Sequence, residues 1–241
     1  MTRLTEHAIE NFAIKLLERL GYEYLYAPEI GPDGERPERT NYGEVLLVER
    51  LRAALRRLNP AVPTEVREEA LKEIGRLNAP DLLTNNEAFH RMLTEGVKVE
   101  YQQNGHTRGD LVKLVDFVTS DNNEFVVANQ FTVVENGVNK RPDVILFVNG
   151  LPLVVLELKN AADEKATVRS AYDQIQTYKA TIPSLFAYNG FVVLSDGLEA
   201  RAGTLSAGLS RFMAWKSADG KEEASNLVSQ METLINGMLN R

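Results

Sequence analysis

The chain has 241 residues and a formal net charge of −7, with 44% hydrophobic residues, 25% charged residues and no cysteine. This composition is ordinary for a folded globular domain and excludes disulfides and thiolate metal sites. The negative net charge argues against a histone-like coat for nucleic acid. No apolar run approaches the roughly 18 residues of a membrane span, and the first residues lack the apolar core of a signal peptide. We therefore expect a cytoplasmic protein that does not contact a membrane.

Helical patterns dominate the first hundred residues. Apolar positions between residues 4 and 20 recur close to every 3.6 residues and Gly21 follows them, which predicts an amphipathic helix. Residues 27–44 are rich in Gly, Pro and charge and predict an exposed loop. Thr64 and Asp81 are the expected N-caps of two later helices. After the first helix, three more are expected at 44–60, 64–78 and 81–96, and the last two of these are the ones that begin at Thr64 and Asp81.

The pattern then changes to β-branched or alternating runs separated by Gly and Asn turns. Strands are expected at 97–101, 111–117, 124–134, 142–148, 151–159, 185–197 and 198–203. Helices are expected at 164–181 and, as an amphipathic C-terminal element, at 224–239. A helical first part followed by a strand meander, a helix, strands and a last helix predicts an α+β or α/β domain.

Several common motifs are missing. The sequence contains no GxxxxGK[ST] phosphate loop, no GxGxxG and no HExxH. Its three histidines, His7, His90 and His106, show no ligand spacing. The chain therefore has no recognisable route to ATP hydrolysis.

One apolar hairpin carries unexpected charges. The stretch RPDVILFVNGLPLVVLELKN has Asp143 near one end and Glu157 and Lys159 near the other, and Asn149-Gly150 is a strong turn signal. With a two-residue loop Asp143 would face Leu156, so the two acids would point to opposite faces. A three-residue loop, or a bulge, would instead place Asp143, Glu157 and Lys159 on one face. A shared site therefore requires either the three-residue loop or the bulge.

Such a face would favour a hard divalent cation. Two adjacent carboxylates repel each other unless a cation lies between them, and oxygen ligands without His or Cys select Mg²⁺ or Mn²⁺. The Leu158 carbonyl is a plausible additional ligand, because the Leu158 side chain should point into the core. Lys159 would return to the same face and orient or deprotonate a water, or stabilise charge on a phosphoryl group.

A simpler interpretation is that all three charged side chains lie in solvent at strand ends, as for most isolated matches to D…ExK. Two features favour a site. The acids terminate long apolar runs, and a helix follows in which Gln174 and Tyr178, four residues apart, share one face. Taken alone, that helix would be interpreted as a surface helix with Tyr178 half buried.

Asp143, the Glu157-Leu158-Lys159 triplet and the Gln174-xxx-Tyr178 pair together resemble the PD-(D/E)xK nuclease superfamily in its QxxxY branch. Longer strings, including GVKVEY, ANQFTV, QIQTYK and SDGLEARAGTLSAG, resemble the N-terminal endonuclease domain of the restriction subunit of type I restriction–modification enzymes. The resemblance runs from about Thr5 to the C-terminus.

This resemblance implies a mixed β-sheet flanked by helices. It places the endonuclease domain at about residues 1–220, with a helical N-terminal insertion at about 43–95 and a catalytic core at about 97–205. It also implies that Asp143 and Glu157 bind Mg²⁺, with Mn²⁺ as a substitute, and that Lys159 is catalytic. A Glu of the first helix would join the metal, with Glu10 as the first candidate and Glu6 as the alternative. Gln174 and Tyr178 would help to position DNA or Lys159.

In this family the subunit continues into an ATP-dependent DNA translocase, so residues 221–241 would form a helix leading to a motor that the chain lacks. ATP would act only through that motor. The expected partners are double-stranded DNA and the methylation and specificity subunits. We expect an excised N-terminal part, although a natural stand-alone protein is an alternative. The basic stretch at 51–58 would be either a local DNA grip or a solvated helix face.

The leading hypothesis is thus a Mg²⁺-dependent DNA endonuclease domain that acts on unmodified foreign DNA after translocation. A second hypothesis is another PD-(D/E)xK activity, such as an exonuclease or junction resolvase. A third is a docking module of the restriction complex whose site is inactive in isolation.

Overall fold

The computed structural model describes residues 6–103, 105–160, 167–225 and 227–241. The helices are α1 Glu6–Arg19, α2 Ala27–Ile30, α3 Val48–Leu58, α4 Thr64–Ile74, α5 Leu82–Glu95, α6 Val168–Thr181, α7 Pro183–Ala187 and α8 Gln230–Met238, with short 3₁₀ turns at Ser120–Asn122 and Leu209–Arg211. The strands are β1 Glu23–Tyr26, β2 Val97–Gln103, β3 His106–Val112, β4 Phe125–Asn129, β5 Val133–Glu135, β6 Val138–Lys140, β7 Val144–Val148, β8 Leu151–Leu158, β9 Phe191–Ser195 and β10 Ala200–Gly203.

A six-stranded mixed sheet forms the centre, in the order β1-β4-β7-β8-β9-β10. β1 pairs with β4 and β8 with β9 in parallel, whereas the remaining neighbours are antiparallel. Two hairpins, β2–β3 and β5–β6, lie outside this sheet. The predicted α/β class, with a mixed sheet flanked by helices as in PD-(D/E)xK-like nucleases, is confirmed.

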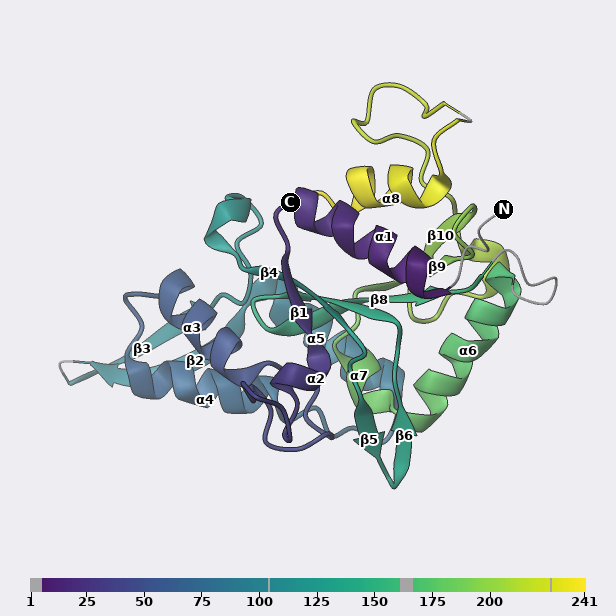
Figure 1. Ribbon diagram of the computed structural model, residues 1–241. Coiled ribbons are helices and arrows are strands. Elements are labelled where there is room, and N and C mark those ends of the chain that lie inside the picture. The colour runs from purple at the N-terminus through teal and green to yellow at the C-terminus, as the bar shows by residue number, and fades with distance from the viewer. Residues whose placement is uncertain (1–5, 104, 161–166, 226) are drawn as a thin grey trace.

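Helices cover both faces of the sheet, with α1 and α8 on one face and α6 and α7 on the other (Figure 1). Side chains of β7 alternate between the two resulting cores. Val144 and Leu146 pack in the cluster of α1 and α8, whereas Ile145 and Phe147 pack in the cluster that includes α6 and α7. A strand buried on both sides explains the continuous apolar run in its sequence.

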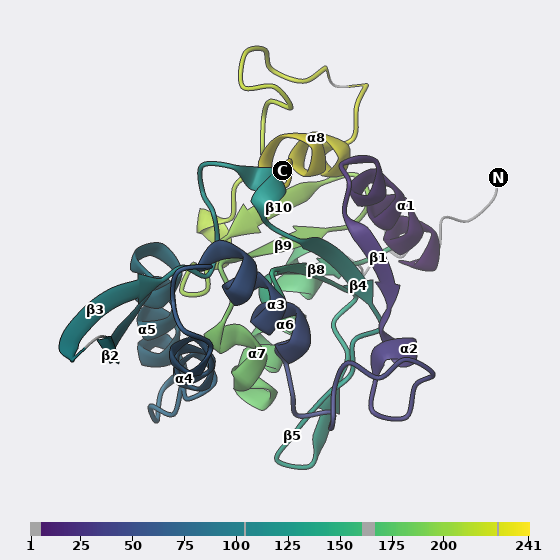
Figure 2. The ribbon, with the colours of Figure 1, turned by 90° about the vertical axis from the view of Figure 1, so that its left-hand side faces the viewer.

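The helices α3 and α4 lie with the β2–β3 hairpin at the left in Figure 1, on the side that faces the viewer in Figure 2. Arg50 of α3 ties this part to the sheet edge, since it forms ion pairs of 2.6 to 2.8 Å with Glu23, Glu38 and Glu124. The three helices that the sequence predicts here are confirmed.

The structure corrects the prediction of a loop at 27–44. Its first residues form the helix α2, and the preceding residues form the edge strand β1, which the sequence pattern did not reveal. Only Leu25 of β1 is buried, so the strand has no apolar alternation. Pro28 in the first turn of α2 and Pro183 in that of α7 start helices rather than loops, because their fixed φ suits these positions.

Other boundaries also differ from the predictions. The N-cap of α4 is Pro63 rather than Thr64, whereas the Asp81 cap of α5 is confirmed by its 2.8 Å bond from the Thr84 N–H. The expected strand at 124–134 is divided at Gln130, whose φ is 58°. The strand expected at 111–117 ends at Val112, that expected at 185–197 begins as α7, and the last helix begins at Gln230. The predicted first turn of the helix at 164–181 falls partly on residues 161–166, which lie outside the described residues.

Gly150 is required by close packing in the β7–β8 turn. Its φ is 81°, and a Cβ there would lie 2.5 Å from the Leu47 carbonyl oxygen and 2.8 Å from the Leu51 nitrogen. Gly137 has a similar φ of 77° but no atom within 4 Å of such a Cβ. A comparison of alanine substitutions at these two glycines therefore separates the energetic cost of a left-handed backbone from that of a steric clash.

We predict that Gly150→Ala lowers the free energy of unfolding by about 1–3 kcal/mol more than Gly137→Ala, because overpacking adds to the left-handed strain. Urea denaturation of both variants measures the difference. Equal losses would show that the α3 backbone moves away without cost.

Candidate active site

The polar residues of interest converge where several strands end. Asn129 is the last residue of β4, Asp143 directly precedes β7, and Glu157 lies one residue before the end of β8. Because β7 is antiparallel to both β4 and β8, these three positions meet at one end of the sheet.

A bulge brings Asp143 and Glu157 together. Val148 pairs with Leu151 across a two-residue turn, yet Leu146 pairs with Val154, so the Leu153 position is the extra residue. The Asp143 Oδ2 accepts a hydrogen bond of 2.7 Å from the Leu158 N–H. The bulge that the sequence analysis named as one of two possibilities is confirmed, and the three-residue loop is wrong.

Both acids lie on the α6 side of the sheet. Ile145 and Val155, two residues from them along each strand, belong to the core cluster of α6, and side chains two apart share a face. The Leu158 side chain packs into the opposite cluster, as the sequence analysis expected.

Glu157 is almost fully buried and only partly satisfied. Its side chain is 1% exposed, and its Oε1 forms an ion pair of 2.7 Å with the Lys159 Nζ. Its Oε2 accepts no hydrogen bond from any residue that the structure describes. A buried carboxylate oxygen without a donor is costly, and a bound cation would satisfy it.

The electrostatics of the two acids reflect burial and mutual repulsion. Burial raises the pKa of Asp143 to about 6, against the opposing effects of the Leu158 N–H and Lys159 and with a contribution from Glu10. Burial, and next the charge of Asp143, raise the pKa of Glu157 to about 8. For Lys159, burial lowers the pKa but the attraction of Glu157 and Asp143 outweighs it, so the pKa is raised.

The Gln174–Tyr178 pair of α6 faces the same acids. The Tyr178 hydroxyl donates a hydrogen bond of 3.3 Å to the Arg141 carbonyl. Burial raises the pKa of Tyr178, and the negative charge of Glu157 raises it further, whereas a hydrogen bond with Gln174 lowers it. The structure therefore brings Gln174 and Tyr178 to the side of Glu157.

Both candidate glutamates of α1 act on the site electrostatically. Glu10 is 5% exposed and Glu6 is exposed at the start of the helix. The charge of Glu10 raises the pKa of Asp143, and that of Glu6 raises the pKa of both Asp143 and Glu157. Glu10 also accepts a hydrogen bond from Asn129 Nδ2 and longer ones of 3.4 Å from Gln130 Nε2. Sequence reasoning missed these two amides, although polar residues that end an apolar strand were a usable signal.

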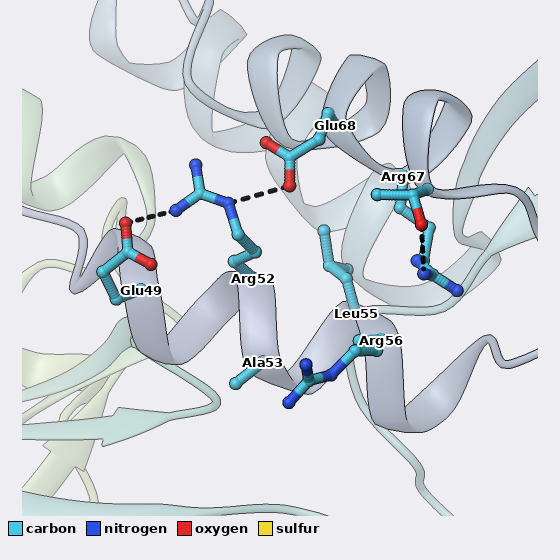
Figure 3. A pocket seen from close by; sticks show the side chains of 8 residues that line it. Glu49, Arg52, Ala53, Leu55, Arg56, Arg67 and Glu68 are labelled. Atoms are coloured by element: carbon cyan, nitrogen blue, oxygen red, sulfur yellow. Dashed lines mark hydrogen bonds and ion pairs between the residues drawn. The ribbon is translucent and has the colours of Figure 1, made fainter.

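Two arginines of the basic stretch at 51–58 form contacts within the domain. Arg52 lies between Glu49 and Glu68, with a distance of 2.8 Å from its Nε to the Glu68 Oε1 (Figure 3). Arg57 donates hydrogen bonds to the Asn122 carbonyl and the Asn149 side chain. Within the stretch at 51–58, Arg52 and Arg57 are thus engaged in the domain, whereas Arg56 is exposed, so the DNA grip stays a prediction that depends mainly on Arg56.

The donor set at the sheet end fits a hard cation with an incomplete protein shell. Within residues 6–103, 105–160, 167–225 and 227–241 no group of three or more His, Asp or Glu side chains forms a ready-made metal cage. Two carboxylates and backbone oxygen match Mg²⁺, which retains waters and is often completed by substrate phosphate.

Comparison with known proteins identifies the family of the chain. The family model described as type I restriction enzyme R protein N terminus matches residues 3–211. The chain belongs to this family. It is 40% identical over 239 residues to the type I restriction enzyme HindI endonuclease subunit of Haemophilus influenzae, covering 98% of this chain and 23% of that protein. It is 34% identical over 221 residues to the putative type I restriction enzyme MjaIXP endonuclease subunit of Methanocaldococcus jannaschii, covering 90% of this chain and 21% of that protein.

As a type I R protein N terminus, the chain spans less than a quarter of the length of these two relatives. Among the helices formed by its described residues, none is long and apolar enough to cross a membrane.

The raised pKa of Glu157 makes the stability of this R protein N terminus depend on pH. Free Glu has a pKa of 4.5, and the folded value is about 8. The folded chain therefore holds a proton that the unfolded chain has lost, and ionisation destabilises the fold as pH rises from about 4.5 to about 8.

We predict that Glu157→Gln, in the presence of EDTA, is more stable than wild type by about 1–3 kcal/mol at pH 8.5, and that the difference disappears near pH 5. Chemical denaturation at both pH values measures it. Glu100→Gln, which changes an exposed acid of β2, is the control and should show no such dependence. A Glu157→Gln variant that is less stable than wild type at pH 8.5 would show that its ion pair with Lys159 outweighs burial.

Proposed function

We propose that the chain is the Mg²⁺-dependent DNA endonuclease domain of a type I restriction enzyme, which hydrolyses phosphodiester bonds. The observation that carries this proposal is the bulged hairpin, which brings Asp143 and the partly unsatisfied Glu157 onto one face beside Lys159. The name of the HindI relative, an endonuclease subunit, supports it.

Asp143, Glu157 and the Leu158 carbonyl would hold the cation, with Glu10 of α1 as a further carboxylate, since its charge acts on Asp143 at the end of the sheet. Mn²⁺ could replace Mg²⁺ because it accepts the same oxygen ligands. When bound, the cation would activate a water molecule and neutralise charge on a phosphoryl oxygen.

Lys159 is the residue that we assign to the reacting phosphate. Its ammonium lies 2.7 Å from Glu157 and remains partly exposed, so it can contact a substrate oxygen without leaving the carboxylate. It would either orient the attacking water or stabilise the negative charge of the phosphoryl group. Gln174 and Tyr178, on the facing side of α6, would position the DNA strand or Lys159.

The remaining functions belong to the larger enzyme of which this would be one domain. We propose double-stranded DNA as substrate, with cleavage of unmodified DNA after ATP-driven translocation by motor domains elsewhere in the subunit. Methylation and specificity subunits would be the partners, in the cytoplasm.

Within this proposal residues 1–220 form the endonuclease domain, with the insertion at about 43–95 and the catalytic core at about 97–205, and residues 221–241 lead towards the motor. α8 packs against α1 in one core cluster, so that connection would start from a helix anchored in the domain.

We predict that Asp143→Asn and Glu157→Gln each weaken Mn²⁺ binding by more than about 100-fold, because changing residues that merely orient ligands already costs 10–100-fold. Calorimetry of the chain with a short DNA duplex tests this. Asp173→Asn, an exposed acid of α6 paired with Arg169, is the matched control and should bind Mn²⁺ like wild type.

The same substitutions in the full-length subunit, assembled with its partners and ATP, should abolish cleavage of circular DNA. Cleavage of linear but not circular DNA would favour an exonuclease. Wild type that binds no divalent cation even with DNA would favour a docking module, and unchanged cleavage by Asp143→Asn would overturn the assigned site.

A further inference from the structure

Glu10 is bound by the side-chain amides of Asn129, at the end of β4, and Gln130, and Tyr24 of β1 supports Asn129; we call these three residues the amide clamp. Asn129 is 3% exposed, and its Nδ2 donates to the Glu10 Oε1. The Tyr24 hydroxyl donates to the Asn129 Oδ1 at 2.9 Å. This second bond fixes the orientation of the amide, because the Asn129 oxygen is occupied by a donor and its nitrogen must face the carboxylate.

Gln130 adds a backbone feature. Its φ of 58° is left-handed, and the other non-glycine residues with positive φ among the described residues are Asn136 and Asn149. Asn adopts this conformation readily, and Asn149 lies in a hairpin turn, whereas Gln does so at a cost. The conformation ends β4 and brings Gln130 Nε2 to 3.4 Å from both oxygens of Glu10. A strained residue of this kind commonly lies at a functional site.

The clamp leaves the two Glu10 oxygens in different states. Oε1 accepts from Asn129, whereas Oε2, as far as the described residues show, accepts only the long contact from Gln130. Among the described residues Glu10 forms no ion pair with Lys or Arg, and a buried carboxylate without such a partner is unusual unless it has a role beyond stabilising the fold. Asn129, which binds Glu10, pairs with Val144 in the register of β4 and β7, one residue from Asp143, and the charge of Glu10 raises the pKa of Asp143.

We infer that the amide clamp positions Glu10 as the third carboxylate of the divalent-cation site, with Asn129 as the main positioning residue. The inference rests on the proposed function. The N–H of Asn129 holds one oxygen, and the other is available to the cation or to a water bound to it. Partners of ligands act in this way at many metal centres, since they fix ligand orientation and raise affinity.

The experiment measures Mn²⁺ affinity of the chain with a short DNA duplex, by electron paramagnetic resonance of free Mn²⁺. We predict that Asn129→Ala weakens binding about 10-fold or more and that Tyr24→Phe, which keeps the ring and removes only the hydroxyl, weakens it a few-fold. Asn59→Ala is the control, because Asn59 is also buried and its side chain bonds to the Leu55 and Lys113 carbonyls, away from Glu10 and from the β7–β8 hairpin. It should retain wild-type Mn²⁺ affinity even where its stability falls.

A double-mutant cycle separates positioning from general damage. If Asn129 acts through Glu10, Asn129→Ala should have no further effect in the Glu10→Gln background. Equal losses in both backgrounds, or wild-type affinity in Asn129→Ala, would overturn the inference. If Asn129→Ala does not fold, as circular dichroism would show, Tyr24→Phe combined with Glu10→Gln gives the same cycle and the same criterion.

The outcome also distinguishes this inference from the proposed function. Loss of Mn²⁺ binding in Asp143→Asn with no effect of Asn129→Ala would reject the clamp alone. Unchanged binding in Asp143→Asn would reject the metal site itself, and the clamp with it.

Discussion

The extra residue at Leu153 fixes the side-chain alternation of the β7–β8 hairpin, and the chemistry of the sheet end depends on it. Without the bulge, the two-residue Asn149-Gly150 turn would send Asp143 and Glu157 to opposite faces. With the bulge, one hairpin combines a tight turn that packs against α3 with a face that carries both acids. Bulges often re-aim a side chain beside a functional site, and here the bulge lies in the middle of the strand pair, away from the residues that it re-aims.

Placing two carboxylates together inside a sheet has an electrostatic cost that the fold does not remove. Lys159 neutralises one oxygen of Glu157, and the Leu158 N–H supports Asp143, yet the pKa of each acid stays raised. A site optimised only for stability would pair both acids or replace them with apolar residues. The remaining repulsion is what a divalent cation would relieve, so the same arrangement that destabilises the free domain favours metal binding.

The strongly periodic parts of the fold could be predicted from the sequence, whereas the features that depend on tertiary contacts could not. An apolar repeat located α1, and continuous apolar runs bounded by a turn signal located the hairpin strands, because burial on one face or on both leaves these patterns in the sequence. The edge strand β1 buries only Leu25, so its existence depends on pairing with β4 and leaves no pattern. For the candidate site, residue types and spacing located Asp143, Glu157 and Lys159 but left the register open. Asn129 and Gln130 went unnoticed because their role depends on Glu10, which is 119 and 120 residues away in the chain.

Most of the arginines of α3 are engaged within the domain. The arginines Arg50, Arg52 and Arg57 of α3 are engaged with glutamates or backbone carbonyls of the domain, and the chain has a net charge of −7. Nucleic-acid affinity comes largely from cations that neutralise phosphates. Under the proposed function, the domain would contribute the acidic centre, and many of the phosphate contacts would come from the rest of the enzyme. Weak DNA binding by the domain alone would prevent the acidic centre from contacting DNA before the larger assembly brings the two together. The negative net charge of the domain would then also restrict the sites at which DNA is cleaved.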